Sequence, residues 1–370
     1  MRIAILADPI DNQSAGVHTF TREMIHSLLR NDRENEYLLF RRKKNPAFAG
    51  ARSIAIPLLR WTLIFPALRL FMIFGRLAGR LKVDVVIEPA HFGPFFMPRR
   101  VKRVTVIHDL TPLKFPEHHR WHSQVLQNLF LRRIMKKADL IITNSENSRQ
   151  DIIRQFPFTE ERVEKIYLGY DASFSPDIRP EVLEQYGITV PYFLFVSTIE
   201  PRKNLSLLLS AYLRFRMNNP MPVQLVIVGA RGWKCRRLFR EISQHHFRSD
   251  IIIPGYVPRS DLPALYSQTM AFVYPSYYEG FGLPVLEAMA CGAPCLVSNA
   301  SSLPEVAGRA ALMFNPFDVS DLTDQLEAVA GNPQQRIEMS ARSIKQAAKF
   351  SWDRFAGEFL DILSSHKMLS

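Results

Sequence analysis

Short apolar runs alternate with longer segments of helical periodicity along almost the whole chain, and this alternation constrains the fold more than any other feature. Repeated strand–helix units of this kind predict parallel sheets and the α/β fold class. Helical segments are expected, for example, at residues 17–29 and 121–136. Strands are expected at residues 2–7, 37–40, 83–87, 103–107, 140–143 and 163–167, and again at 193–196, 224–228, 251–254, 271–274 and 295–297.

The chain has 370 residues, and at about 150 residues per domain that length predicts two domains. A stretch rich in Pro, Asp and Ser, residues 171 to 191, interrupts the alternation and is expected to connect them. Ligands of open parallel sheets bind at the carboxyl ends of the strands. We therefore expect two sheets that face each other across a cleft, with the functional residues at strand ends.

A basic excess is concentrated in residues 41–103. The whole chain has 47 Lys and Arg against 35 Asp and Glu, a net charge of +12, and this segment holds fourteen basic residues against two acidic ones. Its apolar and aromatic part, residues 54–75, is interrupted by Arg and Pro, which favours contact with an anionic membrane surface over a spanning helix. A solvated basic helix is the alternative. Nucleic acid is not expected as a partner, because no aromatic–basic RNA motif or zinc-finger pattern is found.

Three cysteines at irregular spacing do not fit a disulfide framework and indicate a reducing compartment. The first apolar run follows Arg2 at once, so no signal peptide is expected. The protein is expected to stay in the cytoplasm.

The segment AFVYPSYYEGFGLPVLEAMACGAP contains the most informative strand end. Gly280 and Gly282 allow a turn in which the backbone approaches a ligand closely, and Pro284 suits the first turn of a helix that begins near Leu283. The free N–H groups at such a helix start can bind a phosphate. The alternative is a plain strand–turn–helix without a ligand.

Two carboxylates flank this turn. Glu279 precedes the glycines, and Glu287 follows eight positions later, inside the helix. Because a carboxylate only accepts hydrogen bonds, the pair suits a ligand with hydroxyls beside its phosphates, such as a sugar at one end and a ribose at the other.

A second strand end supplies the opposite charge. Arg202 and Lys203 follow the predicted strand at 193–196, and Asn204 is expected to cap the helix after it. Two cations at the positive end of a helix are unfavourable unless an anion is bound there. A guanidinium and an ammonium group at this place could neutralise a diphosphate. Alternatively, both side chains point into solvent.

These motifs resemble a known family. The E-x7-E segment from Glu279 to Glu287, the EPRKN sequence at 200–204, the pair His108-Asp109 and the Phe350-Ser351-Trp352 sequence are similar to those of retaining nucleotide-sugar glycosyltransferases of the GT-B type, family four, also called group 1. The resemblance covers essentially the whole chain and is nearest to bacterial mannosyltransferases. It implies a Rossmann-like acceptor domain at 1–175, a Rossmann-like nucleotide-sugar domain at 190–350, and a last helix, 351–370, that packs back on the first domain.

The resemblance also implies roles for individual residues. Glu279 would contact the donor sugar and Glu287 the ribose, while Arg202 and Lys203 would bind the diphosphate. One departure is that Ser197-Thr198 stands where many relatives have Gly-Arg, which leaves Arg202 as the available guanidinium. The implied catalytic residues are His108, Arg202, Lys203 and Glu279, and the implied nucleotide-sugar-binding residues are Gly16, Gly280, Phe281, Gly282, Leu283 and Glu287.

The activity implied is transfer of a hexose, with mannose from GDP-mannose favoured over UDP- and dTDP-sugars, to a lipid-linked glycan in surface polysaccharide synthesis, at the inner face of the plasma membrane. No Asp-x-Asp motif occurs in the chain, so neither a metal nor another cofactor is expected. A non-catalytic nucleotide-sugar-binding protein and a nucleotide-sugar epimerase are the alternatives.

Overall fold

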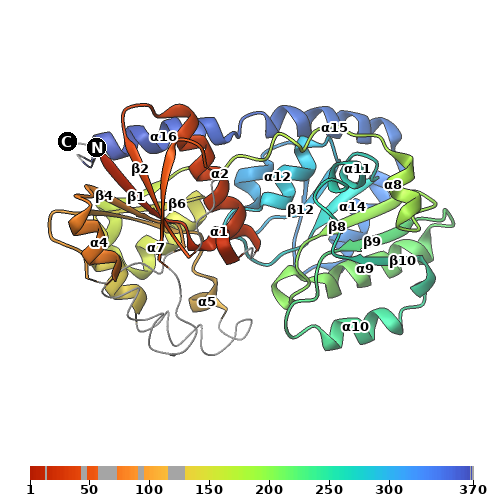
Figure 1. Cartoon of the computed structure of the whole chain (residues 1–370). Coiled ribbons are helices and arrows are strands. Elements are labelled where there is room, and N and C mark those ends of the chain that lie inside the picture. The colour runs from red at the N-terminus through yellow and green to blue at the C-terminus, as the bar shows by residue number, and fades with distance from the viewer. Residues whose placement is uncertain are drawn as a thin grey trace. The chain divides into compact units, whose positions relative to one another are not determined.

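The computed structural model describes residues 1–12, 15–42, 48–56, 73–90, 96–115, 130–366 and 368. The chain divides into two compact units, one formed by Met1–Gly169 with Ser351–Ser370 and one by Tyr170–Phe350. Each unit is built around one parallel sheet (Figure 1).

The sheet of the Met1–Gly169 unit has seven strands in the order β3-β2-β1-β4-β5-β6-β7, and all neighbours are parallel. The central strands are almost completely buried, as expected for a sheet covered on both faces, which explains why they are nearly continuous apolar runs. The strands are β1 (Arg2–Leu6), β2 (Glu36–Arg41), β3 (Ala51–Ala55), β4 (Val85–Glu88), β5 (Lys102–Ile107), β6 (Leu140–Thr143) and β7 (Val163–Lys165).

Helices connect these strands, and the chain's last helix belongs to the same unit. α16 packs against α2, where Phe20 lies 5.7 Å from Phe355 and 6.0 Å from Trp352 between ring centroids (Figure 1). Ser145 caps α7 by accepting a hydrogen bond from the Ser148 amide. The helices described are α1 (Asp8–Asn12), α2 (Ala15–Asn31), α4 (Phe74–Arg80), α5 (Thr111–Lys114), α7 (Glu146–Gln155), η3 (Pro157–Arg162) and α16 (Trp352–Ser365).

The sheet of the Tyr170–Phe350 unit has six parallel strands in the order β10-β9-β8-β11-β12-β13. The strands are β8 (Tyr192–Val196), β9 (Gln224–Val228), β10 (Ile251–Gly255), β11 (Ala271–Tyr274), β12 (Cys295–Ser298) and β13 (Leu312–Phe314). The helices are α8 (Pro180–Gln185), η4 (Pro201–Lys203), α9 (Leu205–Asn218), α10 (Arg236–Ser243), η5 (Arg248–Asp250), α11 (Leu262–Ser267), α12 (Leu283–Ala290), α13 (Leu303–Ala307), α14 (Val319–Gly331) and α15 (Pro333–Ala347).

The α/β prediction with two parallel sheets is confirmed, and every predicted strand is present. The sequence analysis missed β3 and β13, which are edge strands. The ARSIA sequence of β3 is only partly buried, and β13 has three residues, so neither gives a strong apolar signal. The expected connection at 171–191 is in part a helix, because α8 lies within it and packs against α11.

Part of the basic segment at 41–103 lies outside the described residues, namely 43–47, 57–72 and 91–95, and so do residues 121–129 of the expected helix at 121–136. Of the helices in the described ranges, none combines the length and the apolar character needed to cross a bilayer.

Candidate functional site

The candidate site lies at the carboxyl ends of β8 and β11, which are neighbours in the sheet although three crossovers separate them along the chain. The strand order reverses direction between these two strands, because β9 and β10 lie on one side and β12 and β13 on the other. Open α/β sheets bind ligands at such a switch point. The segments 197–204 and 275–282 therefore meet where a ligand is expected.

One backbone hydrogen bond and one side-chain hydrogen bond hold the two segments together. The Tyr277 amide donates to the Arg202 carbonyl at 3.0 Å, and the Arg202 Nη1 group donates to the Tyr278 carbonyl at 2.6 Å. The guanidinium group is thus fixed across both strand ends.

Five side chains from these segments and from β11 form one ionic cluster, which consists of Glu200, Arg202, Lys203, Tyr274 and Glu279. Lys203 Nζ lies 2.5 Å from Glu279 Oε1 and donates to the Tyr274 hydroxyl at 2.7 Å. Arg202 Nη1 lies 2.8 Å from Glu279 Oε2, and its Nη2 lies 2.7 Å from Glu200 Oε1. Two cations and two carboxylates therefore balance in charge.

Burial sets the electrostatics of this cluster, since only 5% of Lys203 and 7% of Glu279 are exposed. Burial alone would raise the pKa of Glu279, but Arg202 and Lys203 outweigh it and lower that pKa to about 2. Burial and the neighbouring Arg202 lower the pKa of Lys203. An additional anion beside these cations would favour the charged form of the lysine.

Two serines that the sequence analysis missed fix the turn after Glu279. The buried Ser302 hydroxyl is within hydrogen-bonding distance of the Glu279 carbonyl at 3.0 Å and of the Phe281 carbonyl at 2.9 Å. The Glu279 amide donates to Ser301 Oγ at 2.8 Å. Because Ser301 and Ser302 lie more than twenty positions away in the sequence, no local pattern indicated them.

The turn ends at Gly282, whose φ of +107° lies in the region that favours glycine. A Cβ atom at this position would lie 2.7 Å from Leu303 Cδ2. The helix α12 begins at Leu283, as predicted, with proline in its first turn. The amide groups at its start belong to the helix N-terminus, where a phosphate can be bound.

The remaining turn residues are buried. Phe281 is 3% exposed and packs edge-to-face on Phe350 at 6.0 Å, so its ring stabilises the unit while its backbone forms the turn. Gly280 is buried, and Leu283 is half-buried.

Glu287, on α12, belongs to a second cluster of charged side chains, together with Arg259 and Asp171. Its Oε1 lies 3.5 Å from Arg259 Nη2, which also lies 3.5 Å from Asp171 Oδ2, and the Arg259 guanidinium stacks on Phe174 at 4.7 Å. Burial raises the pKa of Glu287 to about 7, against the opposing effect of Arg259. Asp171 and Arg259 were not predicted, since they come from segments distant in the sequence.

Asn204 does not cap α9 in the way the sequence analysis predicted. Its backbone has a left-handed φ of +55°, and its side-chain Nδ2 group donates to the Pro316 carbonyl at 2.8 Å. The side chain makes no capping hydrogen bond to α9 because it is used to hold the loop before α14.

His108 follows β5 in the Met1–Gly169 unit. Its Nε2 group lies 2.8 Å from the Pro89 carbonyl, and since a carbonyl only accepts, the proton is on Nε2. The ring packs edge-to-face on Phe20 at 4.7 Å, and burial lowers its pKa. Asp109 accepts from the Thr111 amide at 2.9 Å, as expected for a turn residue.

Gly16 lies inside the first turn of α2, whereas the sequence analysis expected that helix to begin at residue 17. The helix begins two residues earlier than its apolar pattern indicated. No atom would lie within 4 Å of a Cβ atom added at Gly16.

Comparisons with known proteins agree with this architecture. Residues 178–350 match the family model described as Glycosyl transferases group 1, and residues 14–174 match Glycosyltransferase Family 4. The O-antigen chain mannosyltransferase B of Escherichia coli is 38% identical over 269 residues, which are 71% of this chain and 71% of that protein.

A second relative, the serotype-specific mannosyltransferase WbdA of Escherichia coli, is 33% identical over 261 residues. These cover 68% of this chain but 32% of WbdA, so the chain spans about a third of that protein. The solved structure of HepE from Anabaena in complex with UDP-glucose is similar in fold, with a TM-score of 0.75 and 17% identity over 99% of this chain and 100% of that one.

Two parallel-sheet units with a charged strand end at the switch point of the second are the architecture of a GT-B glycosyltransferase. The chain belongs to the group 1 glycosyltransferases of family four, as its motifs indicated, and the two relatives above are named as mannosyltransferases.

Proposed function

We propose that this glycosyltransferase is a retaining hexosyltransferase that moves mannose from GDP-mannose to a lipid-linked glycan in surface polysaccharide synthesis. Two relatives above 30% identity are named as mannosyltransferases, and one of them as an O-antigen chain enzyme, which supports the sugar and the acceptor class. HepE, which binds UDP-glucose in its solved structure, is the reason to keep UDP-sugars as the alternative donor.

The observation that carries the proposal is the ionic cluster at the ends of β8 and β11. Glu279 pairs with both Arg202 and Lys203. We propose that the donor diphosphate replaces Glu279 as the partner of these cations and that the freed carboxylate then accepts hydrogen bonds from hydroxyls of the sugar. Donor binding and sugar recognition would thus be coupled at one residue.

The same cations would stabilise the leaving group. As the bond between the anomeric carbon and the diphosphate oxygen breaks, negative charge grows on that oxygen, and fixed charges beside it lower the barrier. The amides of Gly280, Phe281 and Gly282 and the start of α12 at Leu283 would add hydrogen bonds. Glu287 would hold the ribose.

In the proposed reaction, the acceptor hydroxyl attacks the anomeric carbon from the face that the diphosphate leaves, and the departing diphosphate takes the hydroxyl proton. No carboxylate serves as nucleophile. His108 and Gly16, both in the Met1–Gly169 unit, would contact the acceptor side. We propose that the reaction needs no metal and no further cofactor.

We propose that the protein is cytoplasmic and associates with the inner face of the membrane through its basic segment at 41–103. The charge of this segment supports that location, since each basic residue near an anionic surface contributes about 1 kcal/mol.

The test is transfer from GDP-mannose, UDP-glucose and a dTDP-hexose to a lipid-linked glycan primer, with and without EDTA. We expect transfer from GDP-mannose that EDTA leaves unchanged, an α-linked product from the α-donor, and a melting temperature raised most by GDP. Nucleotide binding without transfer or donor hydrolysis would indicate a binding protein instead. Conversion of the donor sugar to its epimer would indicate an epimerase.

A further inference from the structure

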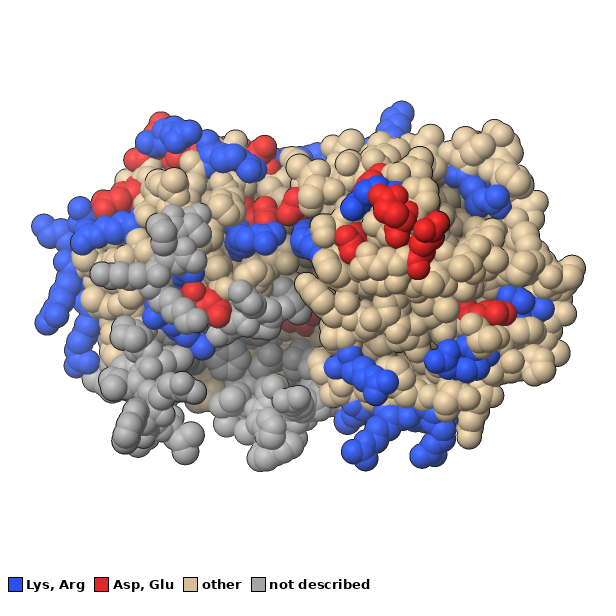
Figure 2. Space-filling model, turned by 45° about the vertical axis from the view of Figure 1, so that its right-hand side comes forward, with Lys and Arg blue, Asp and Glu red and all other residues tan. Residues whose placement is uncertain are grey.

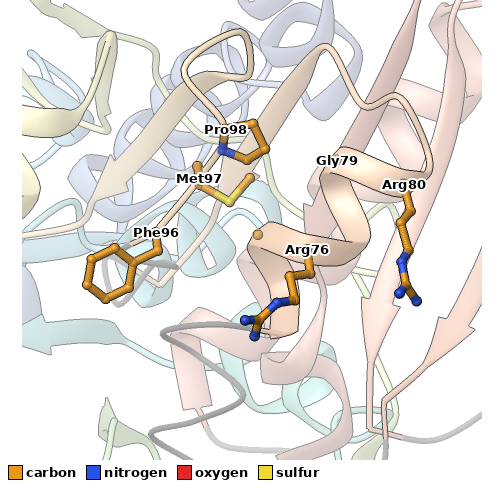
Figure 3. A pocket seen from close by; sticks show the side chains of 7 residues that line it. Arg76, Gly79, Arg80, Phe96, Met97 and Pro98 are labelled. Atoms are coloured by element: carbon orange, nitrogen blue, oxygen red, sulfur yellow. The ribbon is translucent and has the colours of Figure 1, made fainter.

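An open cavity of about 760 Å³ lies in the Met1–Gly169 unit and is lined by α4 and by the segment Phe96–Pro98 that leads to β5 (Figure 3). Its volume is in the range of sites that hold small molecules, about 300–1,000 Å³. The lining from α4 consists of Gly75, Arg76, Gly79 and Arg80.

The sequence of α4 fixes how the two walls of this cavity meet. Phe74 and Ala78 point to the sheet and are buried in its core, which fixes the orientation of the helix. Gly75 permits close approach of the facing segment, because a Cβ atom there would lie 1.8 Å from the Phe96 carbonyl oxygen. At Gly79 a Cβ atom would lie 3.4 Å from Pro98 Cγ, so a side chain there could extend along the cavity without a backbone clash.

The cavity combines an apolar wall with a cationic edge. Phe96 is 57% exposed, and Met97 and Pro98 are partly exposed beside it. Arg76 and Arg80 are exposed one helical turn apart and extend from α4 in similar directions (Figure 3). None of the described residues that line the cavity is acidic.

A further cation lies beside this lining, since Arg100 donates to the Gly79 carbonyl at 2.8 Å. In Figure 2, Lys and Arg side chains gather at the end of this unit where Figure 1 shows α4. A hydrocarbon chain beside a negatively charged group fits this combination, because the apolar wall takes the chain and the arginines bind the charge.

We propose that this cavity binds one anionic phospholipid of the membrane, with a hydrocarbon chain lying along α4 and Phe96–Pro98 and its phosphate between Arg76 and Arg80. The inference deepens the proposed membrane association, because it assigns a single-lipid site in place of a general basic surface.

The first experiment separates the cavity from the charge. Gly79→Leu fills the cavity and leaves the charge unchanged, and Gly357→Leu, at an exposed helical glycine of the same unit with open space around it, is the matched control. In flotation with phosphatidylcholine vesicles containing phosphatidylglycerol, we expect Gly79→Leu to weaken binding about tenfold, the effect of losing roughly two buried methylene groups. Gly357→Leu should bind like the wild type.

A second variant keeps the proposal testable if Gly79→Leu does not fold. Phe96→Ser removes apolar wall at an exposed position and adds no volume, so it should also weaken binding while the melting temperature stays near that of the wild type. Arg76→Gln/Arg80→Gln should abolish the preference for phosphatidylglycerol, whereas Arg33→Gln/Arg354→Gln, which removes equal charge elsewhere on the unit, should keep it.

Photo-crosslinking gives the position of the chain directly. A phosphatidylglycerol with a diazirine in one chain should label Phe96–Pro98 and α4 in the wild type and in Gly357→Leu, and lose that labelling in Gly79→Leu. Unchanged binding by Gly79→Leu, or labelling elsewhere, would overturn the proposal even if the arginine variants bind weakly. Because these assays need no sugar nucleotide, their failure is distinct from failure of the proposed transfer reaction.

Discussion

At the residue scale, the proposed chemistry depends on a buried lysine, Lys203, that shares the Glu279 carboxylate with Arg202. Lys203 contacts Glu279 and Tyr274, and Arg202 links Glu279 to Glu200. Such a cluster is costly to bury unless every charge has a partner. An arrangement that already balances its charges is well suited to exchange one carboxylate for a diphosphate.

Replacement of Lys203 by Met is expected to lower kcat about 10²- to 10³-fold, because one fixed charge at the leaving group is lost. Lys345→Met, at an exposed lysine of α15, is the control and should keep wild-type kcat. Initial rates with GDP-mannose and circular dichroism of both variants measure the effect. Near-normal turnover by a folded Lys203→Met protein would exclude the assigned role.

Glu287 gives a prediction on stability against pH. The folded protein keeps this carboxyl protonated up to a pH of about 7, whereas the unfolded chain releases the proton near 4.5. Between these two pH values the folded state therefore binds more protons than the unfolded chain. The contribution of Glu287 to the free energy of unfolding falls as the pH rises from 4.5 to 7.

Glu287→Gln should remove this dependence and stabilise the ligand-free protein above pH 7 by roughly 1–3 kcal/mol, while it weakens nucleotide binding. Urea unfolding at acidic and alkaline pH measures the first effect, and Glu338→Gln, at an exposed glutamate of α15, is the control. Equal stabilisation at every pH would contradict the assignment of the raised pKa to Glu287.

At the element scale, the site is made by two strand ends and the start of one helix. The beginning of α12 at Leu283 could be predicted from its glycine and proline, since these residues act locally. The edge strand β13 could not, because three residues carry little pattern. Asn204 has the residue type of a cap but bonds a distant carbonyl, and Ser302 and Arg259 join the site only through the tertiary fold.

Gly282→Ala tests the turn. Its φ of +107° costs an L-residue about 1–2 kcal/mol, and the added Cβ atom would contact Leu303. We expect lower stability together with a large loss of kcat. Gly187→Ala, with a φ of +72° and open space around it, should lose stability but keep kcat, and thermal melts with initial rates separate the two effects.

At the scale of the whole molecule, the two parallel sheets share one strand order, 3-2-1-4-5-6 when the strands of each unit are counted from its first, and the Met1–Gly169 sheet adds β7 at its edge. The Tyr170–Phe350 unit holds the ionic cluster, the turn and Glu287, which together would form the donor site. The Met1–Gly169 unit holds His108 and the cavity proposed to bind a lipid. The two-sheet architecture followed from the strand–helix alternation and the family from the resemblance of the motifs, whereas the pairing of Glu279 with both cations required the structure.

The most direct measurement is a crystal structure of the protein with GDP-mannose bound. The account predicts diphosphate oxygens within hydrogen-bonding distance of Lys203 Nζ and the Arg202 guanidinium, with Glu279 moved onto hydroxyls of the mannose. A diphosphate bound elsewhere, with Glu279 still paired to both cations, would contradict it.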